Sequence, residues 1–276
     1  MDHVPVEQNP QRHWLLEVST NRLFPLSSVH HWSIASIEAL VVLYFKHIHP
    51  TMPIIHPETF WRSFKREEDL HDQRAYSLLV ALCAALCVSV HYEPMPQELM
   101  LLYGSWEDLG RAFNAAVPPK RTRDMFAGRS SAVVQNIMLI ALSADLLSLF
   151  SMSTELGFHN GISYESAVGS NIAIHLVNEA IRFAIAYRYD REDTTISPVE
   201  AQTRKLIFFT LYQWSTFGSL MSGNPLAIRS DESHQSLPLQ SNGAFAMPRN
   251  DAPELEEERA FVAFNATCSL CLVIEG

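Results

Sequence analysis

The stretch Tyr76–Val90, YSLLVALCAALCVSV, decides the fold class of this chain. It contains no charged residue, and its apolar side chains point to every side of a helix, which is typical of a helix buried in a globular core. It is too short to span a bilayer, which takes about 20 residues. Cys83 and Cys87 lie four positions apart, so we expect them to be small core residues on one helix face.

Helical periodicity continues on both sides of this stretch. Ser33 or Ser36 is expected to cap a helix that Pro50 ends. Further helices are expected over 58–65, 98–116, 132–150, 164–187, 198–222 and 254–274. Two of them have clear apolar stripes, which are Leu99, Leu102, Trp106, Leu109 and Phe113 in the first and Ile174, Val177, Ile181 and Ile185 in the second. Because no alternating strand pattern occurs, the sequence predicts an all-α fold, an irregular bundle of about eight helices.

The domain organisation follows from composition. Residues 1–32 are polar and proline-broken, as in a tail or linker. Residues 33–238 form the expected domain, 239–253 a surface loop, and 254–276 a C-terminal helix. This last helix is apolar almost to its end, which predicts that the natural chain continues; the alternative is that it packs back on the core.

The charge of the chain argues against a nucleic-acid-binding surface of its own. Its 276 residues carry 20 basic and 30 acidic side chains, a net charge of -10. The one basic cluster, Lys120, Arg121 and Arg123, is too small to neutralise a phosphate backbone. It is expected to be a solvated loop, with a nuclear import signal or a phosphate contact as the alternatives.

Membrane insertion and catalysis find little support in the sequence. Residues 132–150 are long enough to span a membrane but include Gln135, Asn136 and Asp145, so a buried helix is expected. No G-x-S-x-G elbow or glycine-rich phosphate loop occurs. Asp145 is a weak candidate for a buried functional carboxylate. The alternative is that it lies at the edge of the apolar stripe, in contact with water.

Neither a metal ion nor a cofactor is expected to bind this chain. Cys268 and Cys271 form a single C-x-x-C, whereas a zinc site needs four ligands. The early histidines include His47 and His49, which lie two positions apart on different sides of a helix. Packing in the core is expected for both cysteine pairs. Few cysteines and no signal peptide indicate a reducing compartment.

Three stretches together resemble the middle homology region of fungal zinc-cluster regulators. The first lies in Leu40–Phe64 and keeps the residues Tyr44, Phe45, His49, Pro50, Pro53, Ile54, His56, Thr59 and Phe60. The second is the helix Tyr76–Val90. In the third, the family has a helix of the kind Ala-x-Arg-x-Ala-x-x-Leu-Gly-Leu-His-Arg, and this sequence has Ala180-Ile181-Arg182-Phe183-Ala184, then Arg188 and Arg191. Glu200, Arg204, Phe209 and Tyr212 follow, and the turn Gly223-Asn224-Pro225-Leu226-Ala227-Ile228 completes it, with Asp231 and Glu232 behind.

The resemblance covers Ser33 to Pro238 and has departures. Asn224 replaces an arginine, and Gln213 stands where an acidic residue is common, so a polar contact of the family is in doubt here. No cysteine occurs in residues 1–33. The resemblance therefore implies zinc and DNA binding only through a six-cysteine module that these residues do not include.

What the resemblance implies is transcriptional regulation in the nucleus; without it, a cytoplasmic location is expected. The chain would not be an enzyme but would respond to a small-molecule effector or to protein partners, which include itself, a related regulator and the transcription machinery. The expected surfaces are the two turns, with Pro50, Pro53, His56 and Phe60 in the first and Gly223, Asn224, Pro225 and Asp231 in the second.

Two alternatives remain open from the sequence. The chain is then either a helical small-molecule-binding protein or enzyme with a pocket between helices, or a truncated regulator that dampens a full-length relative by pairing with it. Catalytic turnover would separate the first from a regulator, and co-purification with a zinc-cluster protein would support the second.

Overall fold

The computed structural model describes residues 32–66, 68, 72–90, 92–117, 131–132, 134–142, 164–238 and 254–275. Within these residues the structure is all-α, with nine helices and no strands. One isolated bridge joins Arg191 to His234. The all-α prediction is confirmed for the described part of the chain.

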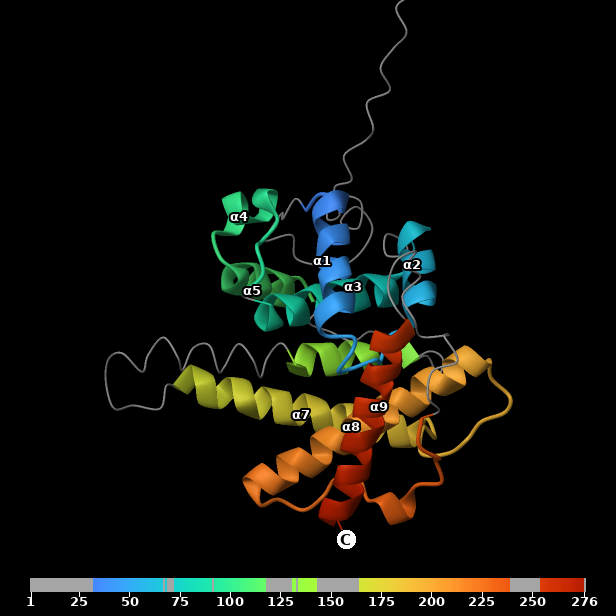
Figure 1. The fold of residues 1–276 in the computed structure, drawn as a ribbon. Helices are drawn as coiled ribbons and strands as arrows, with labels where there is room; N and C mark the ends of the chain where they lie inside the picture. Colours follow the sequence, from blue (N-terminus) through green and yellow to red (C-terminus); the bar gives the residue numbers. More distant parts are fainter. Residues whose placement is uncertain are drawn as a thin grey trace, which may run out of the picture.

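The helices form two groups (Figure 1). The first contains α1 (Ile34–His47), α2 (Pro57–Lys65), α3 (Gln73–Ser89), α4 (Gln97–Tyr103) and α5 (Trp106–Ala116). The second contains α7 (Tyr164–Ala186), α8 (Pro198–Ser222) and α9 (Glu254–Glu275). Helical residues at 131–132 and 134–142, here called the 131–142 helix, lie between the two groups.

Helix α3 is the centre of the first group, as its sequence predicted. It packs against α1 and α5, and its residues from Leu79 to Val88 are all buried. Cys83 and Cys87 are free thiols in this core, so their predicted packing role is confirmed. The approach of α5 is close, because a Cβ at Gly110 would lie 3.2 Å from the Cβ of Cys87. Such a contact is tighter than usual, so the close approach favours glycine on the α5 side.

Helix ends follow the capping residues of the sequence. Ser33 accepts a hydrogen bond from the backbone of Ser36 (3.2 Å), and Ser197 accepts one from that of Glu200 (3.2 Å). Pro198 is the first residue of α8, and Gly223 ends it with φ 70°. The Ser33 and Ser197 side chains satisfy backbone groups that have no partner within the helix. The predicted start of α1 and both predicted ends of α8 are thus confirmed.

The helix predicted over 98–116 is wrong in one respect, because it is two helices. Gly104 adopts φ 73° and ends α4, and Ser105 caps α5 by accepting from the backbone of Asp108 (3.1 Å). The break takes Leu102 off the predicted apolar face, and its side chain is 59% exposed. This division accounts for nine helices where about eight were expected.

The predicted stripe of α7 and the predicted start of the domain also need correction. Ile174 and Ile185 are about half exposed, and α7 is buried instead through Ile181 and the alanines Ala173, Ala180 and Ala184. Small residues let α7 lie close to α8. Trp32, assigned to the tail, is buried against Phe113 with ring centroids 4.2 Å apart and donates to the Tyr103 hydroxyl (2.8 Å).

Helix α9 packs on α8 through one face. Its buried residues are Phe261, Phe264, Cys268 and Cys271. Gln213 of α8 ties the two helices together, because its amide donates to the Phe264 carbonyl (3.3 Å) and to the Cys268 sulfur (3.0 Å). The outer face of α9 keeps Leu270 and Val273 exposed. No helix in the described residues has the length and apolarity to cross a membrane.

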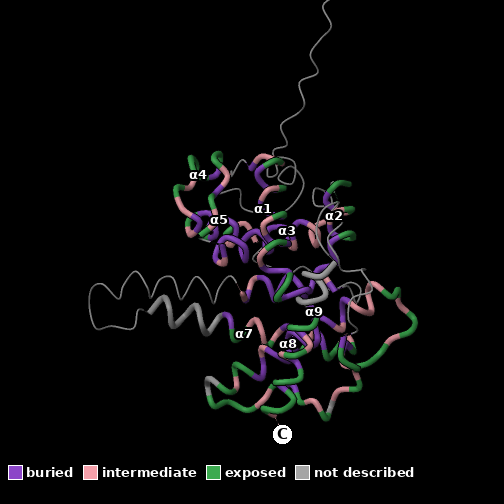
Figure 2. Tube along the Cα trace, viewed as in Figure 1, coloured by how far each residue is buried: buried purple, intermediate pink, exposed green. Residues whose placement is uncertain are grey.

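Buried residues concentrate where α1, α3 and α5 meet and along α8 (Figure 2). One hydrophobic cluster includes residues from both groups of helices. The connections after α7 and after α8 are mostly exposed in the same view. Candidate binding surfaces are therefore to be sought at these connections and where the two groups meet.

Candidate functional site

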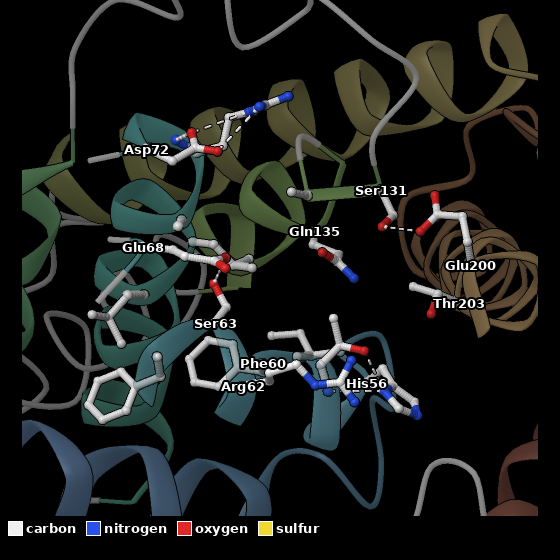
Figure 3. Close-up of a pocket in the computed structure, with 18 of the residues that line it drawn as sticks. His56, Phe60, Arg62, Ser63, Glu68, Asp72, Ser131, Gln135, Glu200 and Thr203 are labelled. Atoms are coloured by element: carbon white, nitrogen blue, oxygen red, sulfur yellow. Dashed lines mark hydrogen bonds and ion pairs between the residues drawn. The ribbon is translucent and has the colours of Figure 1, made fainter. Parts of the chain in front are cut away.

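A groove of about 490 Å³ lies where the two groups of helices meet (Figure 3). We call it the α2 groove, because α2 supplies one wall. The beginning of α3, the 131–142 helix and the first turn of α8 supply the others. Its lining is Ile55, His56, Thr59, Phe60, Arg62, Ser63, Phe64, Arg66, Glu68, Asp72, Arg74, Ala75, Leu78, Leu79, Ser131, Ala132, Gln135, Val199, Glu200 and Thr203.

The inner wall of the α2 groove is apolar. Phe60 and Phe64, one turn apart on α2, stack with ring centroids 6.3 Å apart and an angle of 12° between their planes. Ile55 and Leu79 are buried beside the groove. Apolar walls of this kind hold the hydrocarbon part of a ligand or the apolar face of a peptide.

His56 fixes the start of α2. Its Nδ1 accepts a hydrogen bond from the Thr59 backbone N–H (3.2 Å) and lies 2.8 Å from the Thr59 hydroxyl. Pro57 occupies the first turn, where its missing N–H costs nothing. Accepting this bond requires an unprotonated Nδ1, so His56 acts as a neutral N-cap.

The 131–142 helix connects the two groups of helices behind the groove, through Gln135 on one side and Ser131 on the other. The Nε2 of Gln135 donates to the Ile54 carbonyl (2.5 Å), and the Gln135 side chain is only 5% exposed. Ser131, one turn earlier, donates to Glu200 of α8 (3.0 Å). Figure 3 shows Gln135 between the α2 side and the α8 side of the groove. The sequence had singled out Gln135 as a polar residue of a buried helix, and its burial is confirmed.

The rim of the groove is charged with both signs. Arg62 pairs with Glu58 (2.6 Å), Arg74 with Asp72 (3.2 Å), and Ser63 donates to Glu68 (2.6 Å). The hydroxyls of Ser63 and Ser131 thus donate to carboxylates. These contacts fix a polar rim around the apolar interior of the groove.

The first predicted surface lies mostly inside the protein. Pro50 is exposed, but Pro53 is buried, and the exposed fractions of His56 and Phe60 are 7% and 8%. These three residues are thus largely buried, and their role in a regulatory or partner surface stays a prediction. Two flanking prolines fold the chain inward, and Ile54 and Ile55 then enter the core. His56 and Phe60 still reach the groove with their edges.

The second predicted surface is exposed. Gly223, Asn224, Pro225 and Asp231 all face solvent. The turn is held from beneath, where Ser215 accepts from the backbone of Ala227 (2.9 Å) and Ile228 (3.3 Å). The turn is thus a fixed surface feature on a buried anchor.

Glu275, near the end of α9, holds the other side of this turn. Its carboxylate accepts from the Ser230 backbone (3.0 Å) and from the Tyr212 hydroxyl (2.7 Å). Burial alone would raise the pKa of Glu275, but these hydrogen bonds outweigh it and hold the pKa below its ordinary value. Burial, followed by the contact with Glu275, raises the pKa of Tyr212.

The two predicted surfaces do not come together. Helix α8 begins at the groove and ends at the Gly223 turn, and its 25 residues span roughly 37 Å at 1.5 Å per residue. Figure 1 shows α8 running across α7 and under α9 between these two points. A single rigid helix therefore joins the groove to the turn.

Sequence reasoning did not predict the conformation of Arg188, which ends α7. Its backbone has φ 64°, the only positive value at a non-glycine residue in the described part of the chain. Arg188 N–H bonds to the Ile185 carbonyl (3.0 Å) and Tyr189 N–H to the Ala184 carbonyl (2.9 Å). This is the Schellman end of a helix, where glycine is usual, and an arginine there costs about 1 kcal/mol.

The contacts of Arg204 were not predicted, because Tyr189 and Asp193 are distant from it in sequence. Its guanidinium is nearly buried, pairs with Glu200 (2.9 Å), and lies over the Tyr189 ring at 5.1 Å from the centroid. Asp193 approaches it at 3.8 Å. Glu200 thus links this cluster to Ser131 in the groove. The only sequence signal was the spacing of Glu200 and Arg204 by one helical turn.

Other candidates of the sequence have different outcomes. Asp145 and the basic cluster at 120–123 lie outside the described residues. His47 lies 2.8 Å from Glu93, and His49 is buried against Phe45. Within the described residues, no group of three potential metal ligands comes together.

Cys268 and Cys271 are buried free thiols, as the packing interpretation predicted. Burial raises the pKa of Cys268 to about 11 and also raises that of Cys271. These thiols and the pair on α3 lie in separate helix contacts. They do not have the arrangement of a zinc cluster.

No protein-family model, no curated protein and no solved structure matches the chain.

Proposed function

We propose that this chain is a regulatory domain of the kind found in the middle region of fungal zinc-cluster transcription factors. In this role it performs no chemistry. It modulates transcription by RNA polymerase II by binding an effector or a protein partner in the α2 groove, and it acts on DNA only through a module outside these residues.

The observation that carries the proposal is the backbone at two glycine positions of the family pattern. One is Gly223, with φ 70°. The other is position 188, where the pattern has glycine and this chain has arginine, still with φ 64°. Positive φ is rare for a residue other than glycine. The chain therefore keeps the backbone conformation that suits the pattern even where it has lost the residue, which supports the resemblance.

The α2 groove supports the choice of a binding function. It has an apolar interior, a rim of mixed charge and a volume within the range of about 300–1,000 Å³ that is usual for ligand sites. The Ser63 and Ser131 hydroxyls are engaged with carboxylates, and His56 serves as a helix cap. These engagements favour recognition over catalysis.

Helix α8 offers a physical route from the groove to a second surface. Its first turn contacts the groove through Glu200, and its last turn positions the Gly223 turn. A ligand that shifts the first turn of a rigid helix also shifts its far end. The only requirement is that the ligand has different affinities for the two states of the protein in which α8 is placed differently. The Gly223 turn would then be the surface that reports the occupied groove.

A reporter experiment tests the proposal. The full chain is placed between a heterologous DNA-binding module and an activation segment in yeast, and is compared with a flexible linker in its place. We expect lower reporter output with the chain at equal protein level, and restored output when Pro225, which is exposed, is changed to alanine. Equal output with chain and linker would remove the support for a regulatory role.

A further inference from the structure

A second pocket of about 220 Å³ lies between the end of α7 and the first turns of α8. We propose that this α7–α8 pocket binds a small phosphorylated metabolite through Arg188, Arg191 and Lys205. The inference rests on the contacts of this connection and does not depend on the function proposed above.

The lining of the pocket is unusually basic for a chain with a net charge of -10. It contains the four cations Arg188, Arg191, Arg204 and Lys205 and the two carboxylates Glu192 and Asp193. The side chains of Arg188 and Arg191 are about half exposed, whereas that of Lys205 is only 13% exposed. Cations thus lie both at the mouth and at the base of the pocket.

Both carboxylates of the lining are occupied within the protein. Asp193 accepts from the backbone N–H (2.9 Å) and the hydroxyl (2.5 Å) of Thr195. Glu192 accepts from the Ser236 hydroxyl (2.7 Å), which together with nearby Lys205 lowers the pKa of this carboxyl. Glu192 lies 3.5 Å from Lys205 and Asp193 lies 3.8 Å from Arg204, so these carboxylates offset those two cations. The least matched positive charge is therefore at Arg188 and Arg191, which share Asp190.

Arg188 is the least neutralised of the four cations. Its Nε lies 4.0 Å from Asp190, and that same carboxylate already accepts from Arg191 at 3.1 Å. Two guanidinium groups therefore share one carboxylate. Guanidinium groups bind phosphate and carboxylate in a two-point geometry, so a pair of them at one mouth suits an anion with several oxygens.

The backbone of Arg188 is the second, independent observation. The left-handed conformation costs nothing for glycine but is strained for arginine. Strain of this kind persists where the surroundings or a function require the side chain. Here the side chain that it places is a cation at the mouth of a pocket.

Hydrogen bonds to backbone groups hold the remaining walls in place, so the pocket is formed without a ligand. Gln235 donates to the carbonyls of Tyr189 (3.0 Å) and Arg191 (2.7 Å), and His234 donates to the Asp190 carbonyl (2.9 Å). A small preformed volume with a cation at its base favours a compact terminal phosphate over a polymer such as RNA.

Calorimetry on the full chain tests the inference, with inorganic phosphate and glycerol phosphate as probes at constant ionic strength. We expect saturable binding at one site, weakened about tenfold or more in Arg188→Gly and Arg191→Gln. The matched control is Arg111→Gln, which removes a half-exposed arginine that also lies beside carboxylates, on α5.

Arg188→Gly separates binding from folding, because glycine relieves the strain. The variant should bind the probes more weakly and yet melt at the same or a higher temperature than the wild type. Wild-type affinity in Arg188→Gly would overturn the inference, as would the absence of saturable binding of both probes at millimolar concentration. Equal weakening of binding by Arg111→Gln would show that the effect comes from the overall charge of the protein, and this result would also overturn the inference.

Discussion

Gln135→Met tests the connection between the 131–142 helix and the first group of helices. Methionine matches the length of glutamine but cannot donate to the Ile54 carbonyl, which the wild-type amide meets at 2.5 Å in a buried setting. A buried acceptor left without its donor costs about 1–3 kcal/mol, and a volume-conserving replacement adds less than about 1.5 kcal/mol. We therefore expect a loss of about 2 kcal/mol in the free energy of unfolding.

Urea denaturation followed by far-ultraviolet circular dichroism measures this loss. Gln97→Met is the matched control, because Gln97 is exposed at the start of α4, and we expect it to change stability by less than about 0.5 kcal/mol. A thermal melt should show a decrease of about 4–8 °C for Gln135→Met, at about 2–4 °C per kcal/mol. If both variants lie within about 0.5 kcal/mol of each other, the bond from Gln135 does not join the 131–142 helix to the first group.

Three further predictions concern the helix cap, the C-terminal helix and the thiols. His56→Ala should unfold about 1 kcal/mol more easily than His56→Asn in urea, because asparagine can accept the Thr59 N–H and alanine cannot; equal stability would refute the cap. The pKa of Glu275 lies below its ordinary value of 4.5 in the folded state, so its stabilising effect is complete above that pH and lost as the pH falls through the folded-state pKa. The stability difference between wild type and Glu275→Gln should accordingly shrink on acidification below about pH 4.5 in a pH series of melts, and a constant difference would contradict this. Burial raises the pKa of Cys268 to about 11 and that of Cys83 well above its ordinary value, so all four thiols should react with a thiol reagent only as the protein unfolds; rapid labelling of the native protein would contradict the buried positions.

The sequence predicted helix ends better than helix faces, for a physical reason. Ser33, Ser197 and Gly223 act on neighbours within four residues, so their effect is visible in the local sequence. Gly104 and Gly110 lie in one apparently continuous helical pattern, yet only Gly104 ends a helix. Gly110 is favoured by the close approach of α3, a contact that local sequence does not encode.

The candidate site was predicted in part. The turn that contains His56 and Phe60 does border the groove, but the inward direction of that turn depends on packing by residues far along the chain. The other walls come from Gln135 and Glu200, each brought in by tertiary contacts. Arg188 was noted only as part of the family resemblance, and its left-handed conformation was not predicted, because arginine rarely adopts one.

The proposed regulation of transcription through the α2 groove is tested most directly by one pair of variants. Arg66→Glu reverses an exposed charge that lines the groove, and Lys65→Glu reverses the neighbouring exposed charge, which does not line it. In the reporter fusion at equal protein level, we predict that Arg66→Glu changes the output and Lys65→Glu leaves it at the level of the unaltered chain. Equal outputs from the two variants would contradict this proposal.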